Sequence, residues 1–164
     1  MEEMLQIEEW TNRKVGNIIF DSNIDNWKVS TSVFDQRIIN KEYIMVLIED
    51  EEGNKFGGYV NSKIDKVGGY INDSKSFLFS LVSNGRMEGM KKFDIKEPEY
   101  AFYLYNQLCD WLFDFGYCDI TIGKENDKTR SCCRQLSFEY EGIESLLCGK
   151  YNFTPKRIMV IEMK

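Results

Sequence analysis

Short hydrophobic runs separated by polar turns recur along most of the chain. Residues 43–48 form one such run, Tyr-Ile-Met-Val-Leu-Ile, and a second run at residues 55–60 follows an acidic cluster and the turn signal Gly53-Asn54. A hydrophobic run of this length, bounded by turn signals, is typical of a buried strand. Because a tight turn separates the two runs, they are predicted to pair as an antiparallel hairpin.

The same pattern predicts strands at residues 15–20, 76–82, 90–95 and 157–163. Asn84-Gly85 is a strong turn signal and is expected to join the second and third of these strands. Residues 99–122 are interpreted as several short strands, because aromatic side chains are frequent there. Residues 63–75 and 124–130 are predicted to be loops.

Helices are expected to be few and short. A helix is predicted at residues 2–11, ending near Trp10. A second helix is predicted farther along the chain, where one helical face would carry Val33, Phe34, Ile38 and Ile39. A further helix is expected at residues 143–148, with Gly149 as its C-terminal stop. Many strands with few short helices predict an α+β fold, a sandwich of two mainly antiparallel β-sheets with short helices packed around it.

The length and composition fit one domain. The chain has 164 residues, of which 43% are hydrophobic and 29% charged, and one core commonly serves about 100–200 residues. Nothing along the sequence indicates a linker. We therefore expect a single domain over residues 1–164, with residues 1–14 as an N-terminal helical extension.

The net charge of −6 argues against nucleic acid as a general partner, since both are anionic. Lys124, Lys128, Arg130 and Arg134 lie close together in sequence and could form a basic contact patch. The ordinary explanation of such a cluster is a solvated loop. If these basic residues instead form a contact patch, a nucleic-acid-binding transcriptional regulator is one alternative function.

The chain contains no histidine. This excludes Ser-His-Asp and Cys-His nucleophile pairs and zinc sites that need histidine. No phosphate-binding glycine motif occurs, and no pair of acidic residues has a spacing that indicates catalysis. The sequence therefore predicts no enzyme, no cofactor and no metal site.

The five cysteines are odd in number and show no Cys-x-x-Cys spacing, so a disulfide framework is not expected. The acidic N-terminus does not resemble a secretory signal, and no hydrophobic run approaches the ~20 residues that span a bilayer. A cytoplasmic or nuclear protein without membrane insertion is predicted. The adjacent Cys132 and Cys133 are the expected redox-sensitive point, and a cysteine-based peroxide scavenger is a second alternative.

Several motifs, taken in order, resemble the TLDc domain family. They are Ile18-Ile19-Phe20-Asp21-Ser22, Gly53-Asn54-Lys55-Phe56-Gly57-Gly58-Tyr59, Ser76-Phe77-Leu78-Phe79-Ser80-Leu81, Phe115-Gly116 with Asp119-Ile120, and finally 147–153 with 158–162. The chain lacks the Gly-Pro that usually precedes Phe-Gly in the family. It therefore resembles a divergent, free-standing member.

This resemblance implies a two-sheet sandwich in which the motif residues are structural. These residues are Phe56, Gly57, Gly58, Tyr59, Phe77, Phe79, Phe115, Gly116 and Asp119. It also implies a non-enzymatic protein-interaction or regulatory domain associated with oxidative-stress resistance, with a subunit of the vacuolar proton-pumping ATPase as one candidate partner. No catalytic residues are established for the family.

The resemblance makes a specific prediction for Gly57 and Gly58. They should lie in an inner strand paired with residues 43–48, either because another segment crowds that face or because the backbone needs a dihedral angle that only glycine adopts at little cost. Phe56 and Tyr59 should point to opposite faces of that strand. One is expected in the core between the sheets, and the other under an outer helix or loop.

Overall fold

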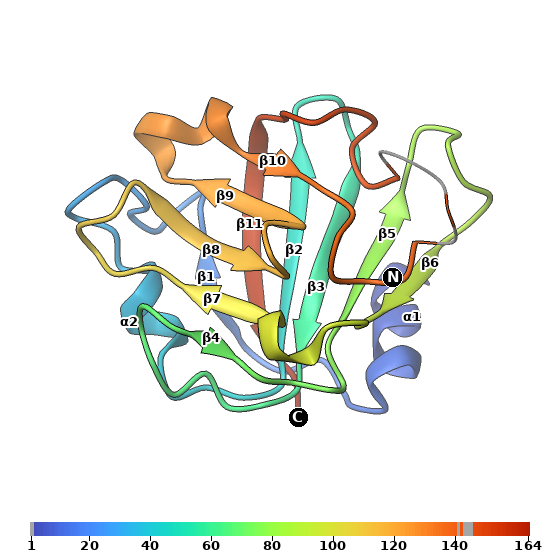
Figure 1. The fold of residues 1–164 in the computed structure, drawn as a ribbon, viewed down its shortest axis with the longest axis horizontal. Helices are drawn as coiled ribbons and strands as arrows, with labels where there is room; N and C mark the ends of the chain where they lie inside the picture. The colour runs from blue at the N-terminus through green and yellow to red at the C-terminus, as the bar shows by residue number, and fades with distance from the viewer. Residues whose placement is uncertain (1, 141, 143–145) are drawn as a thin grey trace.

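The fold of the computed structural model is a sandwich of two antiparallel sheets, as predicted (Figure 1). Residues 2–140, 142 and 146–164 are described. Within them, the six-stranded sheet has the order β1 (Ile18–Asp21), β11 (Pro155–Glu162), β2 (Ile44–Asp50), β3 (Lys55–Val60), β5 (Phe77–Val82) and β6 (Lys91–Asp94). The five-stranded sheet has the order β10 (Cys132–Cys133), β9 (Ile120–Gly123), β8 (Trp111–Phe115), β7 (Phe102–Leu104) and β4 (Tyr70–Ile71). In the view of Figure 1, strands β7 to β9 cross the direction of strands β2, β3 and β11 at a steep angle.

The helices of the described residues are short. They are α1 (Glu2–Thr11), α2 (Phe34–Ile38) and the 3-10 helices η1 (Pro98–Tyr100) and η2 (Glu125–Arg130). The helix predicted at residues 2–11 is confirmed. Of the helix predicted at 143–148, residues 143–145 lie outside the described residues, and residues 146–148 form a turn.

Most predicted strands are confirmed, and residues 99–122 do form short strands, as expected. Two predicted loops contain regular structure. Residues 63–75 contain the two-residue strand β4, which forms because Tyr70 pairs with Tyr103 on β7. Residues 124–130 contain the 3-10 helix η2. Neither element is long enough to leave a periodic hydrophobic pattern in the sequence.

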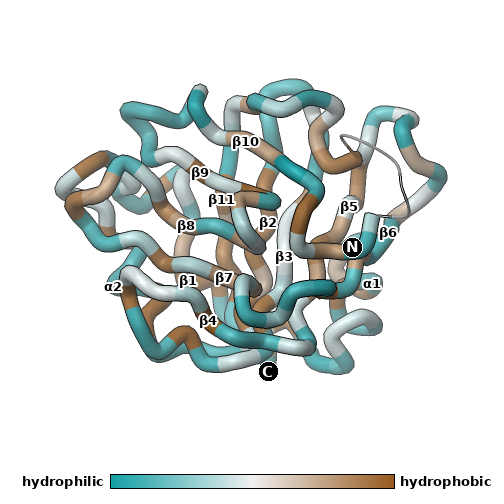
Figure 2. The backbone as a smooth tube through the Cα atoms, in the orientation of Figure 1, coloured by the Kyte–Doolittle hydropathy of each residue, from teal (hydrophilic) through white to brown (hydrophobic). Residues whose placement is uncertain are grey.

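The hydrophobic core lies between the sheets. Phe56 on β3, Phe113 and Phe115 on β8, and Ile120 and Ile122 on β9 are fully buried in it. Hydrophobic segments follow the strands, whereas the η2 segment at the rim is hydrophilic (Figure 2). The alternation of side chains along a strand thus directs one face of each sheet into the sandwich.

The opposite face of the six-stranded sheet is covered by α1. Ile7 of this helix packs with Met45, Tyr59, Phe77 and Phe79 in a second hydrophobic cluster. Tyr59 therefore lies under an outer helix while Phe56 enters the core between the sheets. Both halves of that prediction are confirmed.

Gly57 and Gly58 pair with Leu47 and Val46 of β2, as predicted. A Cβ atom on Gly57 would overlap the carbonyl oxygen of Val46. A Cβ on Gly58 would stand 2.6 Å from Cε1 of Phe115, which belongs to the other sheet. Each glycine is therefore present because another atom already occupies the place of its side chain.

The C-terminal strand β11 lies between β1 and β2. Ile161 pairs with Ile18 on one side and with Met45 on the other. At the end of this sheet, Asp21 of β1 accepts two hydrogen bonds from the guanidinium of Arg157, at 3.1 and 2.6 Å. The strand therefore joins the N-terminal segment to the central hairpin.

Candidate functional site: the surface beside β10

Two segments that are distant from the central hairpin in sequence form one surface beside β10. Cys133 donates its backbone N–H to the carbonyl oxygen of Tyr151 at 2.8 Å, and Phe153 donates to that of Ser131 at 3.0 Å. Cys132 also forms an isolated bridge with Asn152. The edge of the five-stranded sheet is thus covered by the segment 151–153, which keeps the side chains of both segments close together.

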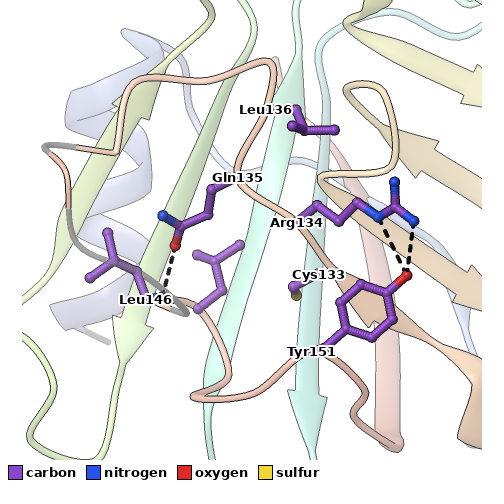
Figure 3. Close-up of a pocket in the computed structure, with 7 residues that line it drawn as sticks. Cys133, Arg134, Gln135, Leu136, Leu146 and Tyr151 are labelled. Carbon is purple, nitrogen blue, oxygen red and sulfur yellow. Dashed lines mark hydrogen bonds between the residues drawn. The ribbon is translucent and has the colours of Figure 1, made fainter.

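A cleft of about 340 Å³ opens between these segments. Cys133, Arg134, Gln135, Leu136, Leu146, Leu147 and Tyr151 line it. Figure 3 shows Leu136 and Leu146 on opposite sides of the cleft and Cys133 beside Tyr151. Leu136 is 40% exposed and Tyr151 is 49% exposed, so the cleft offers accessible apolar surface.

Arg134 and Tyr151 form one wall of this cleft. The Arg134 Nε and Nη2 atoms donate to the Tyr151 hydroxyl at 3.3 and 3.2 Å, and the guanidinium carbon lies 5.6 Å from the ring centre (Figure 3). Such a pair presents a flat apolar surface together with a positive charge. The arrangement suits a partner that offers an apolar side chain next to a carboxylate.

The same two residues also border a second groove, of about 650 Å³. Its other lining residues include Tyr105, Trp111 and Arg130. The guanidinium of Arg130 lies 4.8 Å from the Trp111 ring centre. Arg134 and Tyr151 therefore stand between two depressions that together form an extended surface.

The predicted basic patch is only partly present. Lys124 is 2% exposed, and its Nζ donates to the carbonyl oxygens of Asn106 at 3.0 Å and Gln107 at 2.7 Å. Burial lowers the pKa of this ammonium group. Lys124 thus supports a neighbouring loop and is not on the surface, which removes it from the predicted patch.

The remaining basic residues of the patch are more accessible, but acidic neighbours offset the charge of one of them. Lys128 is half-buried, and Arg130 and Arg134 are exposed. The Nη1 atom of Arg130 lies 4.0 Å from a carboxylate oxygen of Asp110 and 3.8 Å from one of Asp127. This surface is therefore mixed in charge and does not form a continuous cationic track.

Cys132 and Cys133 do not act as a vicinal pair in this structure, because adjacent strand residues point to opposite sides. Cys132 lines the second groove together with Cys118. Cys133 lines the cleft, whereas Cys148 donates its thiol to the carbonyl oxygen of Lys150 at 2.9 Å. Sequence reasoning missed Tyr151, because no local pattern reports its contact with Arg134 across 17 positions.

Asp119 fixes the segment that carries Leu136. Its carboxylate accepts hydrogen bonds from the backbone N–H of Leu136 at 3.1 Å, from the backbone N–H of Ser137 at 3.0 Å and from the hydroxyl of Tyr140. Gly116 has a φ of 66°, and a Cβ there would overlap this carboxylate. The Phe-Gly and Asp of one motif thus position a wall of the cleft.

A second buried carboxylate lies on the outer face of the five-stranded sheet. Asp114 is 1% exposed and accepts a hydrogen bond from the Tyr105 hydroxyl at 2.7 Å. Burial raises its pKa above 3.8, and the hydrogen bonds oppose this shift only in part. Oδ1 of Asp114 and Oγ1 of Thr121, on the paired strand β9, lack hydrogen-bond partners.

Metal-binding and membrane-spanning features were sought in the part of the chain that the structure describes. No group of three or more cysteine, aspartate or glutamate side chains there could hold a metal ion. None of the described helices has the length and hydrophobicity required to cross a bilayer.

The motif residues and the two-sheet sandwich agree with one known family. The family model for the TLDc domain matches residues 3–160. The chain belongs to the TLDc domain family. Membership links this TLDc domain to oxidative-stress resistance. No curated protein sequence matches it.

Proposed function

We propose that this TLDc domain is a non-enzymatic protein-interaction domain that contributes to oxidative-stress resistance. Its family membership over residues 3–160 supports the link to stress. As its partner we propose a subunit of the vacuolar proton-pumping ATPase, and the domain would then regulate that assembly. The surface beside β10 would be the contact region.

The observation that carries this proposal is the composition of the cleft. Leu136 supplies exposed apolar surface beside the buried Leu146 and Leu147, and Arg134 and Tyr151 supply a cation and an aromatic ring at the wall of the cleft. Arginine and tyrosine are enriched among the residues that dominate binding energy at protein interfaces. Charged groups at the rim of such a site mainly set specificity and the rate of association.

The buried carboxylates support a binding role rather than a catalytic one. Asp119 accepts three hydrogen bonds from its own chain, and Asp114 is held by Tyr105 below the surface. Each of them is engaged in structure and is not presented to a substrate. The raised pKa of Asp114 and that of Asp119 follow mainly from burial.

The test is affinity capture with the purified domain, from cell lysate and from isolated vacuolar ATPase, read by mass spectrometry. Three baits are compared: the wild type, Arg134→Glu and Lys63→Glu. Lys63 is exposed on the loop between β3 and β4. The two variants change the net charge equally, so Lys63→Glu is the matched control.

We expect ATPase subunits on the wild-type and Lys63→Glu baits and at least a tenfold loss on Arg134→Glu, which corresponds to about 1.4 kcal/mol. Capture that is equal on all three baits would remove the surface beside β10 from the proposal. If no protein is enriched and cells depleted of the protein tolerate peroxide normally, the proposed function is wrong.

A further inference from the structure

Five tyrosines gather on the outer side of the five-stranded sheet. Together they form the tyrosine face, which consists of Tyr70, Tyr100, Tyr103, Tyr105 and Tyr117. Their rings make a continuous series of contacts, with centres from 4.6 Å apart (Tyr103 and Tyr105) to 6.4 Å apart (Tyr70 and Tyr117). Four of these side chains are partly buried and Tyr117 is 52% exposed. The rings are therefore accessible, while neighbouring rings hold one another in place.

Strand geometry directs these rings away from the core. Phe102 and Leu104 on β7 are buried between the sheets, so Tyr103 between them points to the opposite side. Tyr103 pairs with Tyr70 on β4 and with Asp114 on β8. One row of outward-pointing residues therefore crosses the sheet from the β4 edge.

None of the described helices lies over this row at β8 and β9. The helix α1 packs through Ile7 on the outer side of the other sheet, whereas β8 and β9 stand uncovered at the front of Figure 1. Tyrosine offers a large and rigid contact area at a low cost in conformational entropy. An accessible group of such rings on an uncovered sheet is typical of an interaction site.

The angles between the rings indicate the class of ligand. The Tyr70 ring lies at 73° to the Tyr100 ring and at 72° to the Tyr103 ring, and only the longest contact, with Tyr117, is near parallel. Rings that are nearly perpendicular leave grooves between them, whereas flat ligands such as sugar rings and nucleobases stack on coplanar rings. Aromatic grooves accept proline-rich segments, whose polyproline II conformation exists before binding.

The tyrosine face continues into the second groove, which contains two arginines. Tyr105 lines that groove together with Trp111, Arg130 and Arg134. The Arg134 guanidinium is exposed and donates to the Tyr151 hydroxyl, and no ion pair between described residues involves it. A ligand that extends from the tyrosines into this groove therefore meets a positive charge, which favours an acidic residue at that end.

We propose that the tyrosine face binds a proline-rich segment in the polyproline II conformation, with an acidic residue at the end near Arg134. Neighbouring strands are about 4.8 Å apart, so five strands span roughly 19 Å. Polyproline II rises about 3.1 Å per residue, so about six residues cross the sheet. This goes beyond the proposed function, because it names a class of partner segment and a contact face outside the cleft.

The experiment is calorimetric titration of synthetic peptides into the purified full chain. The first peptide has six prolines followed by glutamate, and the second ends in lysine instead. The third keeps the glutamate and replaces the prolines with alternating glycine and serine, which removes the preformed conformation. We expect saturable binding of the first peptide, at least about threefold weaker binding of the second, and no binding of the third at about 1 mM.

Two variants locate the bound peptide. Tyr103→Ala removes the central ring and Tyr117→Ala removes the most exposed one, and each should weaken binding of the first peptide about tenfold, because aromatic anchors dominate interface energies. Tyr43→Ala is the matched control, since Tyr43 is a partly buried tyrosine packed against the second hydrophobic cluster, beside α1. It should bind the peptide as the wild type does. Unfolding curves establish which variants are folded, and Tyr117→Ala decides the matter if Tyr103→Ala is not.

Equal binding of all three peptides, or unchanged affinity in the folded tyrosine variants, would overturn the proposal. Maltohexaose and a thymidine hexanucleotide are titrated in parallel, and tighter binding of either than of the first peptide would overturn it as well. Affinity capture of ATPase subunits tests the proposed function separately. Capture without peptide binding rejects only the site on the tyrosine face, and peptide binding without capture rejects only the ATPase as partner.

Discussion

The ring of Phe115 occupies the position that a side chain on residue 58 would need. Gly58 lies on β3 of the six-stranded sheet, and Phe115 lies on β8 of the five-stranded sheet. A Cβ on Gly58 would stand 2.6, 2.7 and 2.8 Å from three atoms of that ring. Two separate motifs of the sequence thus form one contact that sets the separation of the sheets at this point.

Gly58→Val should destabilise the domain by about 1–3 kcal/mol through overpacking. Because Phe115 is fully buried, its ring cannot move into solvent to make room. A domain of this size has about 5–15 kcal/mol of net stability, so the loss should appear as a clear fall in the midpoint of urea unfolding.

The matched control is Gly69→Ala, where the added Cβ would meet only the end of the Lys66 side chain, at 3.0 Å. Its stability should change by less than about 0.5 kcal/mol. Combining Gly58→Val with Phe115→Leu should cost less than the sum of the two single changes, because the smaller side chain opens space. Strict additivity would contradict the proposed contact.

Asp119→Ala should be among the most destabilising polar substitutions. It leaves the N–H groups of Leu136 and Ser137 and the hydroxyl of Tyr140 without their acceptor, at about 1–3 kcal/mol for each buried group that stays unpaired. Tyr140→Phe removes only one of the three donors and should cost less. Thermal unfolding of both variants gives the comparison, and a larger loss for Tyr140→Phe would contradict the assigned role of Asp119.

Asp114→Asn should make the domain more stable at pH 7. The pKa of Asp114 is raised in the folded state, so its stabilising contribution is present below pH 3.8 and is lost as the pH rises through the folded-state pKa. An asparagine keeps an acceptor for Tyr105, carries no buried charge and can donate towards the unpartnered Thr121 Oγ1.

The measurement is the melting temperature of wild type and Asp114→Asn between pH 3 and pH 8. The advantage of the variant should grow with rising pH. Tyr105→Phe is the companion variant. It removes the Tyr105 hydrogen bond from the buried charge, so its cost should be larger at pH 7 than at pH 3. A difference that does not depend on pH would contradict this account.

Arg157→Gln should give a pH dependence of the opposite sign. The hydrogen bond from Arg157 lowers the pKa of Asp21, so the stabilisation is present above pH 3.8 and is lost as the pH falls through the folded-state pKa. The Arg157 side chain is 41% exposed, so the difference at pH 7 should stay below about 1 kcal/mol. Equal stability at pH 7, or a gap that widens in acid, would contradict the pairing.

Much of the fold could be predicted from the sequence because its signals are local. The hairpin of β2 and β3 follows from two hydrophobic runs and the turn Gly53-Asn54, and the opposite faces of Phe56 and Tyr59 follow from the geometry of a strand. The predicted crowding at Gly58 was also correct. Its source, Phe115, required the relative placement of two sheets.

The surface beside β10 could be predicted only in fragments. Arg130, Arg134 and Cys133 were named from their neighbourhood in sequence, and they do lie on it. The burial of Lys124 depends on carbonyl groups of a loop 17 and 18 positions away, and the place of Cys133 beside Tyr151 depends on the edge of β10. No periodic pattern reports contacts of this kind.

The central position of β11 has a consequence for biosynthesis. Residues of β1 and β2 leave the ribosome long before Pro155–Glu162 has been made, and until then a gap separates them in the sheet. The unpaired edges of β1 and β2 are open to other extended chains during that interval, because an unpaired strand edge templates association. Translation at about 5–20 residues per second makes the interval last several seconds. Nascent chains of this protein should therefore depend on chaperones that shield strand edges until translation ends.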